Sequence, residues 1–306
     1  MLQFLSARTR LLVVAPHPDD ETLATGLLIQ HVLAASGTVH VLLLSDGDNN
    51  PWPQRWLERR VLIRVADRLR WATRRRDEFR AAMRCLGLAD EACTALGWAD
   101  QGLTRRVQQQ LPASLAALRA VLDAFEPTVV AMPALQDRHP DHSAAHVLLR
   151  LAMQGRGAPP DVWLYQVHGP ALAGSDAFVL PADDAMQSRK RAALARHASQ
   201  LALSAGRMAR LAERPERYLP LRPATARSHL PWRPPRLSWP WLTLTVADTA
   251  GAGAWPWSRA PWVRAGQGYA LTAPASDAGD PRFAKLQARL PSPWIFDHWG
   301  WCELAH

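Results

Sequence analysis

The chain has 306 residues, 48% hydrophobic and 21% charged, with a formal net charge of +9. This composition excludes a disordered chain, and at about 150 residues per domain the length predicts one large domain or two ordinary ones. The apolar runs are only strand-sized, so we expect neither a transmembrane segment nor a secretory signal. Three cysteines without metal-type spacing favour a reducing, cytoplasmic setting.

The first two thirds of the chain alternate between apolar strands and helices. Continuous apolar strands alternating with helices are typical of a mostly parallel sheet, so we predict an α/β fold. Its core is a Rossmann-like, doubly wound sheet with helices on both faces. In chain order we expect a strand at 11–15, a helix at 23–33, a strand at 39–44, helices at 54–71 and 74–86, a strand at 93–98, a helix at 112–125, a strand at 128–132, a helix at 143–151, strands at 162–167 and 177–180, and a helix at 188–210.

The composition changes near residue 220. Residues 215–306 hold 13 of the 25 prolines, and nine of the 14 tryptophans follow Leu230. Proline at this density opposes long helices. We therefore divide the chain into a domain of residues 1–222 and a Pro/Trp-rich C-terminal extension, 223–306. We expect the extension to consist of short strands and turns around tryptophan, packing on or beside the first domain.

The positive charge is concentrated in one stretch. Between Arg55 and Arg84 there are eleven arginines against four acidic residues. Such a cationic element indicates an anionic partner, although a solvated helix face has the same composition. Both interpretations stay open at this stage.

Two polar segments follow predicted strands. One is Ala-Pro-His-Pro-Asp-Asp-Glu at 15–21, and the other is Asp-Arg-His-Pro-Asp-His at 137–142. Ligands of open α/β sheets bind at the carboxyl ends of the strands, and both segments are expected there. Taken singly, the first could be a helix N-cap and the second a polar loop. Two such segments on one edge favour a functional site.

These residue types can build a catalytic zinc site, which needs three His or carboxylate ligands and one open position. His17 and Asp20 are close enough in sequence to chelate one ion, and His142 would be the third ligand. Asp19 would stay off the metal and take a proton from water, and His139 would face the same cavity. Asp141 could hold one of the histidines by its second ring nitrogen.

At these residues the sequence resembles the PIG-L/LmbE-like zinc-dependent N-deacetylases, whose signature is A-H-P-D-D-E after a strand and H-P-D-H later. Here Pro16 replaces the alanine before the histidine. The likeness covers roughly residues 8–222. Further stretches resemble family motifs: Ser45-Asp46-Gly47, Arg76-Asp77-Glu78, 96–103 (Leu-Gly-Trp-Ala-Asp-Gln-Gly-Leu), and the segment from Lys190 through His197 to Gln200.

The resemblance implies roles for individual residues. His17, Asp20 and His142 are the implied zinc ligands, with Asp19 as general base and then acid. His139 is implied to stabilise the tetrahedral oxyanion, and Asp141 to orient it. Arg76 and Asp100 occupy positions that contact the sugar in the family. The implied activity is the hydrolysis of the acetamide of an N-acetylglucosamine-bearing glycoconjugate, releasing acetate and a free amino sugar, as in cell-surface glycan or glycolipid biosynthesis.

Two other functions fit parts of the sequence. A metal-dependent phosphoesterase could use the same His/Asp cluster, although such enzymes usually bind two metals. A non-enzymatic module could bind an anionic surface through the arginines and the tail tryptophans. As partners we expect a large anionic glycoconjugate and no nucleic acid, and peripheral membrane contact is compatible with the composition. Packing in a core or a lid is the favoured interpretation of the tail tryptophans. As a further hypothesis, some of them, among them Trp232, Trp239, Trp241 and those from Trp255 to Trp262, form a wall of the acceptor site.

Overall fold

The computed structural model describes residues 5–222, 229–272, 280–289 and 296–304. The chain divides into two compact units, one made of residues 1–102, 125–133 and 160–221, and the other of 103–124, 134–159 and 222–306. The second unit thus combines the C-terminal tail with helices from the middle of the chain. Among the described residues no helix is both long and apolar enough to cross a bilayer. The boundary at residue 222 stays a prediction.

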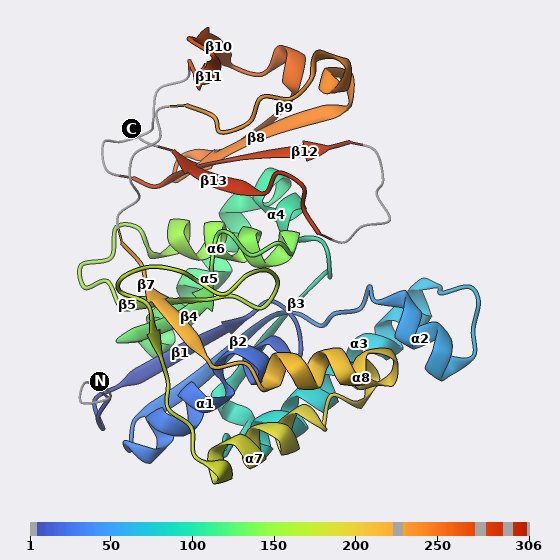
Figure 1. The fold of residues 1–306 in the computed structure, drawn as a ribbon, viewed down its shortest axis with the longest axis vertical. Helices are drawn as coiled ribbons and strands as arrows, with labels where there is room; N and C mark the ends of the chain where they lie inside the picture. Colours follow the sequence, from blue (N-terminus) through green and yellow to red (C-terminus); the bar gives the residue numbers. More distant parts are fainter. Residues whose placement is uncertain (1–4, 223–228, 273–279, 290–295, 305–306) are drawn as a thin grey trace. The chain divides into compact units, whose positions relative to one another are not determined.

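The first unit is built on a seven-stranded sheet with the order β3-β2-β1-β4-β5-β7-β6 (Figure 1). The strands from β3 to β5 are parallel, whereas β7 pairs antiparallel with β5 and β6 antiparallel with β7. The predicted mostly parallel α/β sheet is therefore confirmed. The strands are β1 (Arg10–Ala15), β2 (Thr38–Ser45), β3 (Cys93–Trp98), β4 (Val129–Pro133), β5 (Asp161–Tyr165), β6 (Phe178–Val179) and β7 (Arg217–Pro220).

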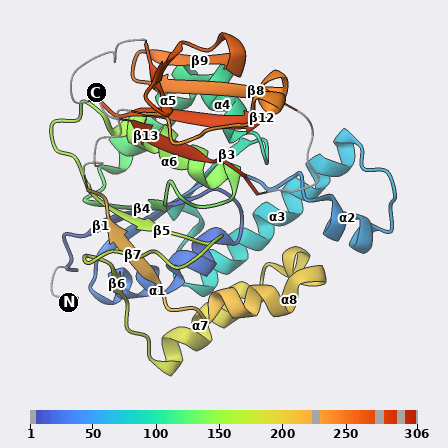
Figure 2. The same ribbon diagram turned by 45° about the horizontal axis from the view of Figure 1, so that its top comes forward.

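Four helices of this unit pack against one another and lie on the same side of the sheet (Figure 2). The core between them and the sheet contains apolar side chains of β1 and β2 together with Phe79, Met83 and Tyr218. Since the central strands are covered by other elements, they need apolar residues at every position, which explains their continuous hydrophobic runs. The helices are α1 (Asp20–Ala34), α3 (Val65–Cys85), α7 (Asp184–Leu194) and α8 (Ala198–Ala212).

Two predicted helical stretches differ from the structure. The helices expected at 54–71 and 74–86 are α2 (Pro51–Glu58) and α3, so the break lies at 59–64 and not near residue 73. Arg59 ends α2 in a left-handed conformation, with φ of 52°. The single helix expected at 188–210 is the pair α7 and α8, interrupted before Ala198. Neither break contains glycine or proline, the usual sequence signals of a helix end.

The second unit contains an antiparallel sheet with the order β13-β12-β8-β9. Side chains of this sheet contact two helices of the unit. Gln108 donates to Thr245 Oγ1 at 2.8 Å, and Arg150 forms a two-bond ion pair with Glu303 at 2.7 and 3.0 Å. The elements of this unit are α4 (Leu103–Gln109), α5 (Leu111–Phe125), α6 (Pro140–Met153), β8 (Leu242–Asp248), β9 (Gly251–Pro256), β10 (Trp262–Ala265), β11 (Gly268–Leu271), β12 (Arg282–Ala288) and β13 (Trp301–Leu304).

The tail tryptophans mostly form the core of this unit. Trp257 is fully buried, and its ring lies 5.4 Å from that of Trp262 and 6.4 Å from that of Trp239. Trp232 is buried in the same cluster. The expectation that these indoles line an acceptor site is therefore wrong for the buried Trp232 and Trp257, which pack with leucines of the same cluster. Trp239 and Trp262 are only partly buried, and for them it stays a prediction. Trp241 remains half exposed, and Trp294 lies outside the described residues.

Candidate active site

The connection between β1 and α1 is held by hydrogen bonds around His17. The backbone N–H of His17 donates to Asp20 Oδ2 at 2.9 Å, and its Nδ1 lies 3.3 Å from the same oxygen. Its Nε2 lies 3.1 Å from Asp100 Oδ1. Both ring nitrogens of this buried histidine thus face carboxylates, which is the environment of a metal ligand or of a protonated imidazole.

Asp19 lies in this connection with a strained backbone. Its φ is 123°, a region that residues other than glycine rarely adopt. The buried Arg75 side chain holds the turn by donating to Pro18 O at 2.7 Å and to Gly47 O at 2.9 Å, and its Nη2 lies 3.3 Å from Asp19 Oδ2. Burial raises the pKa of Asp19 to about 7, although the Arg75 charge opposes this shift. A carboxyl group with such a pKa can exchange protons near neutral pH.

Arg75 explains the Ser-Asp-Gly motif after β2. Gly47 has a φ of +63°, and a Cβ built there would lie 1.6 Å from Arg75 Nη1. Only glycine therefore leaves room for the guanidinium to reach the Asp19 turn. Arg76 but not Arg75 was predicted to have a role, because adjacent arginines on a helix look equivalent until the buried face is known.

Arg76 and Asp100, the predicted sugar contacts, have clear partners in the structure. Arg76 is partly exposed and forms a two-bond ion pair with Asp46, with Nε 3.0 Å from Oδ1. Asp100 accepts from the backbone N–H of Asn49 at 3.2 Å in addition to its His17 contact. Burial opposes ionisation of Asp100, but His17, the Arg75 charge and the Asn49 amide together lower its pKa. Asp100 thus lies beside the His17 ring, whereas Arg76 contacts Asp46.

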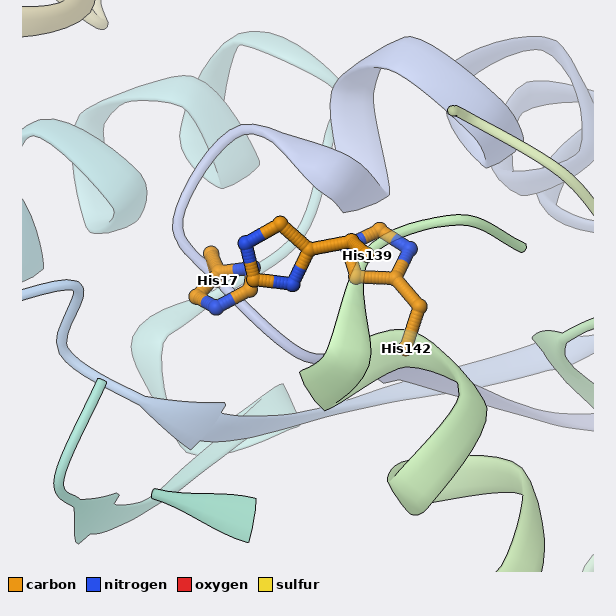
Figure 3. Close-up of side chains that lie close together, drawn as sticks. All are labelled: His17, His139 and His142. Atoms are coloured by element: carbon orange, nitrogen blue, oxygen red, sulfur yellow. The ribbon is translucent and has the colours of Figure 1, made fainter. Parts of the chain in front are cut away.

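The second polar loop connects β4 to α6. His139 is the N-cap of α6, and its Nδ1 accepts from the backbone N–H of Asp141 at 3.2 Å. The rings of His139 and His142 lie 5.1 Å apart, on the first turn of the helix (Figure 3). Asp137 Oδ2 lies 3.2 Å from His142 Nδ1, and Asp141 Oδ1 accepts from the backbone N–H of Leu103 at 3.0 Å. A carboxylate at Nδ1 of His142 is typical of metal-bound histidines, and Asp137, which had no predicted role, provides it.

The two loops follow neighbouring strands. Within the sheet β1 pairs with β2 on one side and with β4 on the other, so the strand order reverses between β1 and β4, where α/β proteins bind ligands. In the first unit the residues His17, Asp20, Asp100 and His168 offer possible metal-ligand atoms, and in the second unit His139, Asp141 and His142 do. Figure 3 labels three of these histidines, His17, His139 and His142.

The segment from Lys190 to Gln200 braces the start of α1. His197 Nε2 lies 3.0 Å from Glu21 Oε1, and this contact raises the pKa of His197 even though burial alone would lower it. The fully buried Lys190 donates to Leu23 O at 2.9 Å and to Glu216 at 2.7 Å. These contacts fix the helix that begins at Asp20. We therefore interpret the motif around Lys190 and His197 as structural, because its residues hold the helix that begins at the site.

Comparison with known proteins gives consistent matches. Residues 12–153 match the PIG-L family, described as GlcNAc-PI de-N-acetylase. The chain is similar to the 1D-myo-inositol 2-acetamido-2-deoxy-alpha-D-glucopyranoside deacetylase of Mycolicibacterium vanbaalenii, with 31% identity over 64% of this chain and 82% of that protein. The enzyme of the same name from Mycolicibacterium smegmatis is 34% identical over 47% of this chain and 53% of that protein. In that comparison the chain spans about half the length of its relative.

A solved structure shows the same fold. A deacetylase of the teicoplanin biosynthetic pathway, crystallised as a triple mutant, superposes with a TM-score of 0.55 at 24% identity. The match covers 69% of this chain and 97% of that protein. At this identity the likeness supports the fold of the sheet and its helices.

Proposed function

Because the chain belongs to the PIG-L family of de-N-acetylases, we propose that it hydrolyses the acetamide of an N-acetylglucosamine-type sugar with one zinc ion. The reaction releases acetate and a free amino sugar. The observation that carries this proposal is the turn between β1 and α1, where the buried, strained Asp19 lies in sequence between His17 and Asp20, whose side chains are 3.3 Å apart. Relatives that are at least 30% identical to the chain over the aligned residues are named deacetylases of a 2-acetamido sugar.

By ligand type the predicted set fits zinc. His17 Nδ1 and Asp20 Oδ2 lie 3.3 Å apart in the first unit, and His142, in the second unit, remains the predicted third ligand. His17, Asp20 and His142 supply two imidazoles and one carboxylate, as in catalytic zinc sites that keep one position open. Asp137 at Nδ1 of His142 would set the tautomer that offers Nε2 to a metal. When bound, zinc lowers the pKa of water and polarises the amide carbonyl.

The protein groups supply the remaining chemistry. Asp19 takes the proton of the attacking water and later delivers it to the leaving amine, which requires a carboxyl whose pKa lies near neutrality. Arg75 holds Asp19 in place from the opposite side of the turn. His139 donates to the developing oxyanion, a contribution worth about 3–4 kcal/mol for a single donor. Asp141 organises the first turn of α6 through its backbone bond to His139.

The substrate is a large anionic glycoconjugate in this proposal. Its support is the exposed arginines of α3 and of the segment before it, among them Arg59, Arg64 and Arg68. Exposed charges attract phosphates over a range of about 8–10 Å at physiological ionic strength. Arg76 and Asp100 would contact the sugar near the His17 loop.

The test is deacetylation by purified protein that has been stripped of metal and reloaded with zinc. The substrates are N-acetylglucosaminyl-inositol, N-acetylglucosaminyl-phosphatidylinositol and N,N'-diacetylchitobiose, and the products measured are acetate and free amine. We expect turnover of at least one of them, lost after chelation and restored by zinc. Asp123→Asn, at a carboxylate that is two-thirds exposed, is the matched control for Asp19→Asn.

Two outcomes would contradict the proposal. Absence of acetate release from every N-acetyl sugar by the zinc-loaded protein would refute the activity. Two metals per chain together with hydrolysis of a phosphate ester would instead support the phosphoesterase alternative.

A further inference from the structure

Residues 51–69, which we call the α2–α3 arm, expose an unusual number of apolar side chains. Thirteen large hydrophobic residues are exposed in the described part of the chain, and seven of them lie in this arm. They include two tryptophans, each about two-thirds exposed. The seven are Trp52, Trp56, Leu57, Val61, Leu62, Val65 and Leu69.

Positive charge is interleaved with these apolar side chains. The arm contains five arginines and two acidic residues. Both acids already have partners: Glu58 binds Arg70, and the buried Asp67 binds Arg60 and Arg70. Five arginines against two acids give the arm a net charge of +3. Its arginines are Arg55, Arg59, Arg60, Arg64 and Arg68.

One side of the arm packs against the rest of the unit. Its exposed side chains are therefore not core residues exposed by poor packing. Gln54 is buried and donates to the backbone oxygen of Asp67 at 2.7 Å, which ties α2 to the first turn of α3. Asn50 donates to Gln200 of α8 at 3.0 Å. Figures 1 and 2 show α2 beside the N-terminal end of α3, at the end directed away from the sheet. These hydrogen bonds fix the backbone of the arm, whose apolar and cationic side chains remain exposed to solvent.

We propose that the α2–α3 arm docks the protein onto an anionic lipid surface. Stable peripheral binding needs two signals, an apolar face that enters the interface and a basic set that pairs with anionic headgroups, and the arm has both. Tryptophan suits the boundary between headgroups and acyl chains because its ring is apolar and its N–H is polar. An apolar protein partner would not need the interleaved arginines, so the charge favours lipid.

The arm lies close to the candidate site in the same unit. Asn49, two residues before the arm, donates its backbone N–H to Asp100, which in turn contacts His17. The arm thus belongs to the same unit as the candidate site. The proposed docking surface is additional to the proposed activity, and lipid binding is measured without turnover, so the two proposals fail separately.

The experiment is co-sedimentation of the full chain with vesicles of phosphatidylcholine alone or mixed in equal parts with phosphatidylglycerol. We expect binding to the anionic vesicles that weakens as salt rises. Trp52→Ser with Trp56→Ser should lower the partition coefficient about tenfold or more. Arg59→Glu with Arg68→Glu should lower it at least about 25-fold, since each basic residue contributes roughly fivefold.

Matched controls are Leu203→Ser with Leu237→Ser, and Arg189→Glu with Arg236→Glu, all at exposed positions outside the arm. They should bind as the unmodified chain does, and thermal melting should show that every variant is folded. The proposal is overturned if the protein ignores anionic vesicles or if the arm variants bind as the controls do. It is also overturned if the unmodified chain dimerises and the tryptophan variant does not, because the arm would then be an interface between copies.

Discussion

Asp19→Asn separates the chemistry of the site from its stability. Burial raises the pKa of Asp19 from 3.8 to about 7 in the folded protein. Between these values the folded chain keeps a proton that the unfolded chain has lost, so the free energy of unfolding falls as pH rises. A difference of about three pKa units corresponds to about 4 kcal/mol. Asparagine stays neutral and avoids this cost, and like aspartate it tolerates a positive φ.

We therefore expect metal-free Asp19→Asn protein to be more stable than the unmodified chain by about 2–4 kcal/mol at pH 8, with the difference vanishing near pH 4. The same variant, loaded with zinc, should bind the metal and lose about 10²–10⁴-fold in turnover. Urea unfolding at the two pH values measures the first effect. Metal content and acetate release measure the second.

Two results would refute this reasoning. If Asp19→Asn destabilises the metal-free protein at pH 8, Asp19 is ionised at little cost, and the Arg75 contact outweighs burial. If the variant loses zinc, Asp19 is a metal ligand and its assignment is exchanged with that of Asp20. Asp123→Asn should change neither stability nor turnover, since its carboxylate is mostly exposed.

Three further predictions test other parts of the account. His139→Ala should keep zinc and lose about 10²–10³-fold in turnover, measured as acetate release, whereas unchanged turnover would exclude an oxyanion role. Lys190→Met should lower the free energy of unfolding by about 3–5 kcal/mol in urea titrations, because Glu216 is left with a buried charge. Raising salt should increase KM for a large anionic glycoconjugate, leave kcat nearly constant and leave KM for neutral N,N'-diacetylchitobiose unchanged.

The sequence predicted the elements whose pattern is local. The apolar runs at 11–15 and 39–44 gave β1 and β2, and the two polar segments were correctly expected to follow neighbouring strands. Hydrophobic periodicity failed to predict helix ends that are determined by tertiary contacts. The helix at 188–210 breaks before Ala198, where His197 turns its ring to Glu21. The strand β7, which lies between β5 and β6, was missed because its sequence, Arg-Tyr-Leu-Pro, has neither a continuous nor an alternating apolar pattern.

Site residues with a motif could be found, and those without one could not. The roles assigned to His17, Asp19 and Asp20 remain predictions. The structure gives the contacts of these three side chains. Arg75 was missed since only the three-dimensional packing of α3 shows which of two adjacent arginines is buried. Asp137 was quoted in its segment without a role, and its contact with His142 depends on the turn between β4 and α6. The one sequence feature that could have indicated Arg75 was Gly47, because the Arg75 guanidinium occupies the place where a side chain at position 47 would lie.

The most direct test of the central claim is a metal titration of the stripped protein, followed in parallel by acetate release from N-acetylglucosaminyl-inositol and N-acetylglucosaminyl-phosphatidylinositol. The account predicts that activity rises linearly to a break at one zinc per chain, and that His142→Ala protein neither retains this zinc nor becomes active. Full activity of the metal-free protein, or of His142→Ala protein, would contradict it.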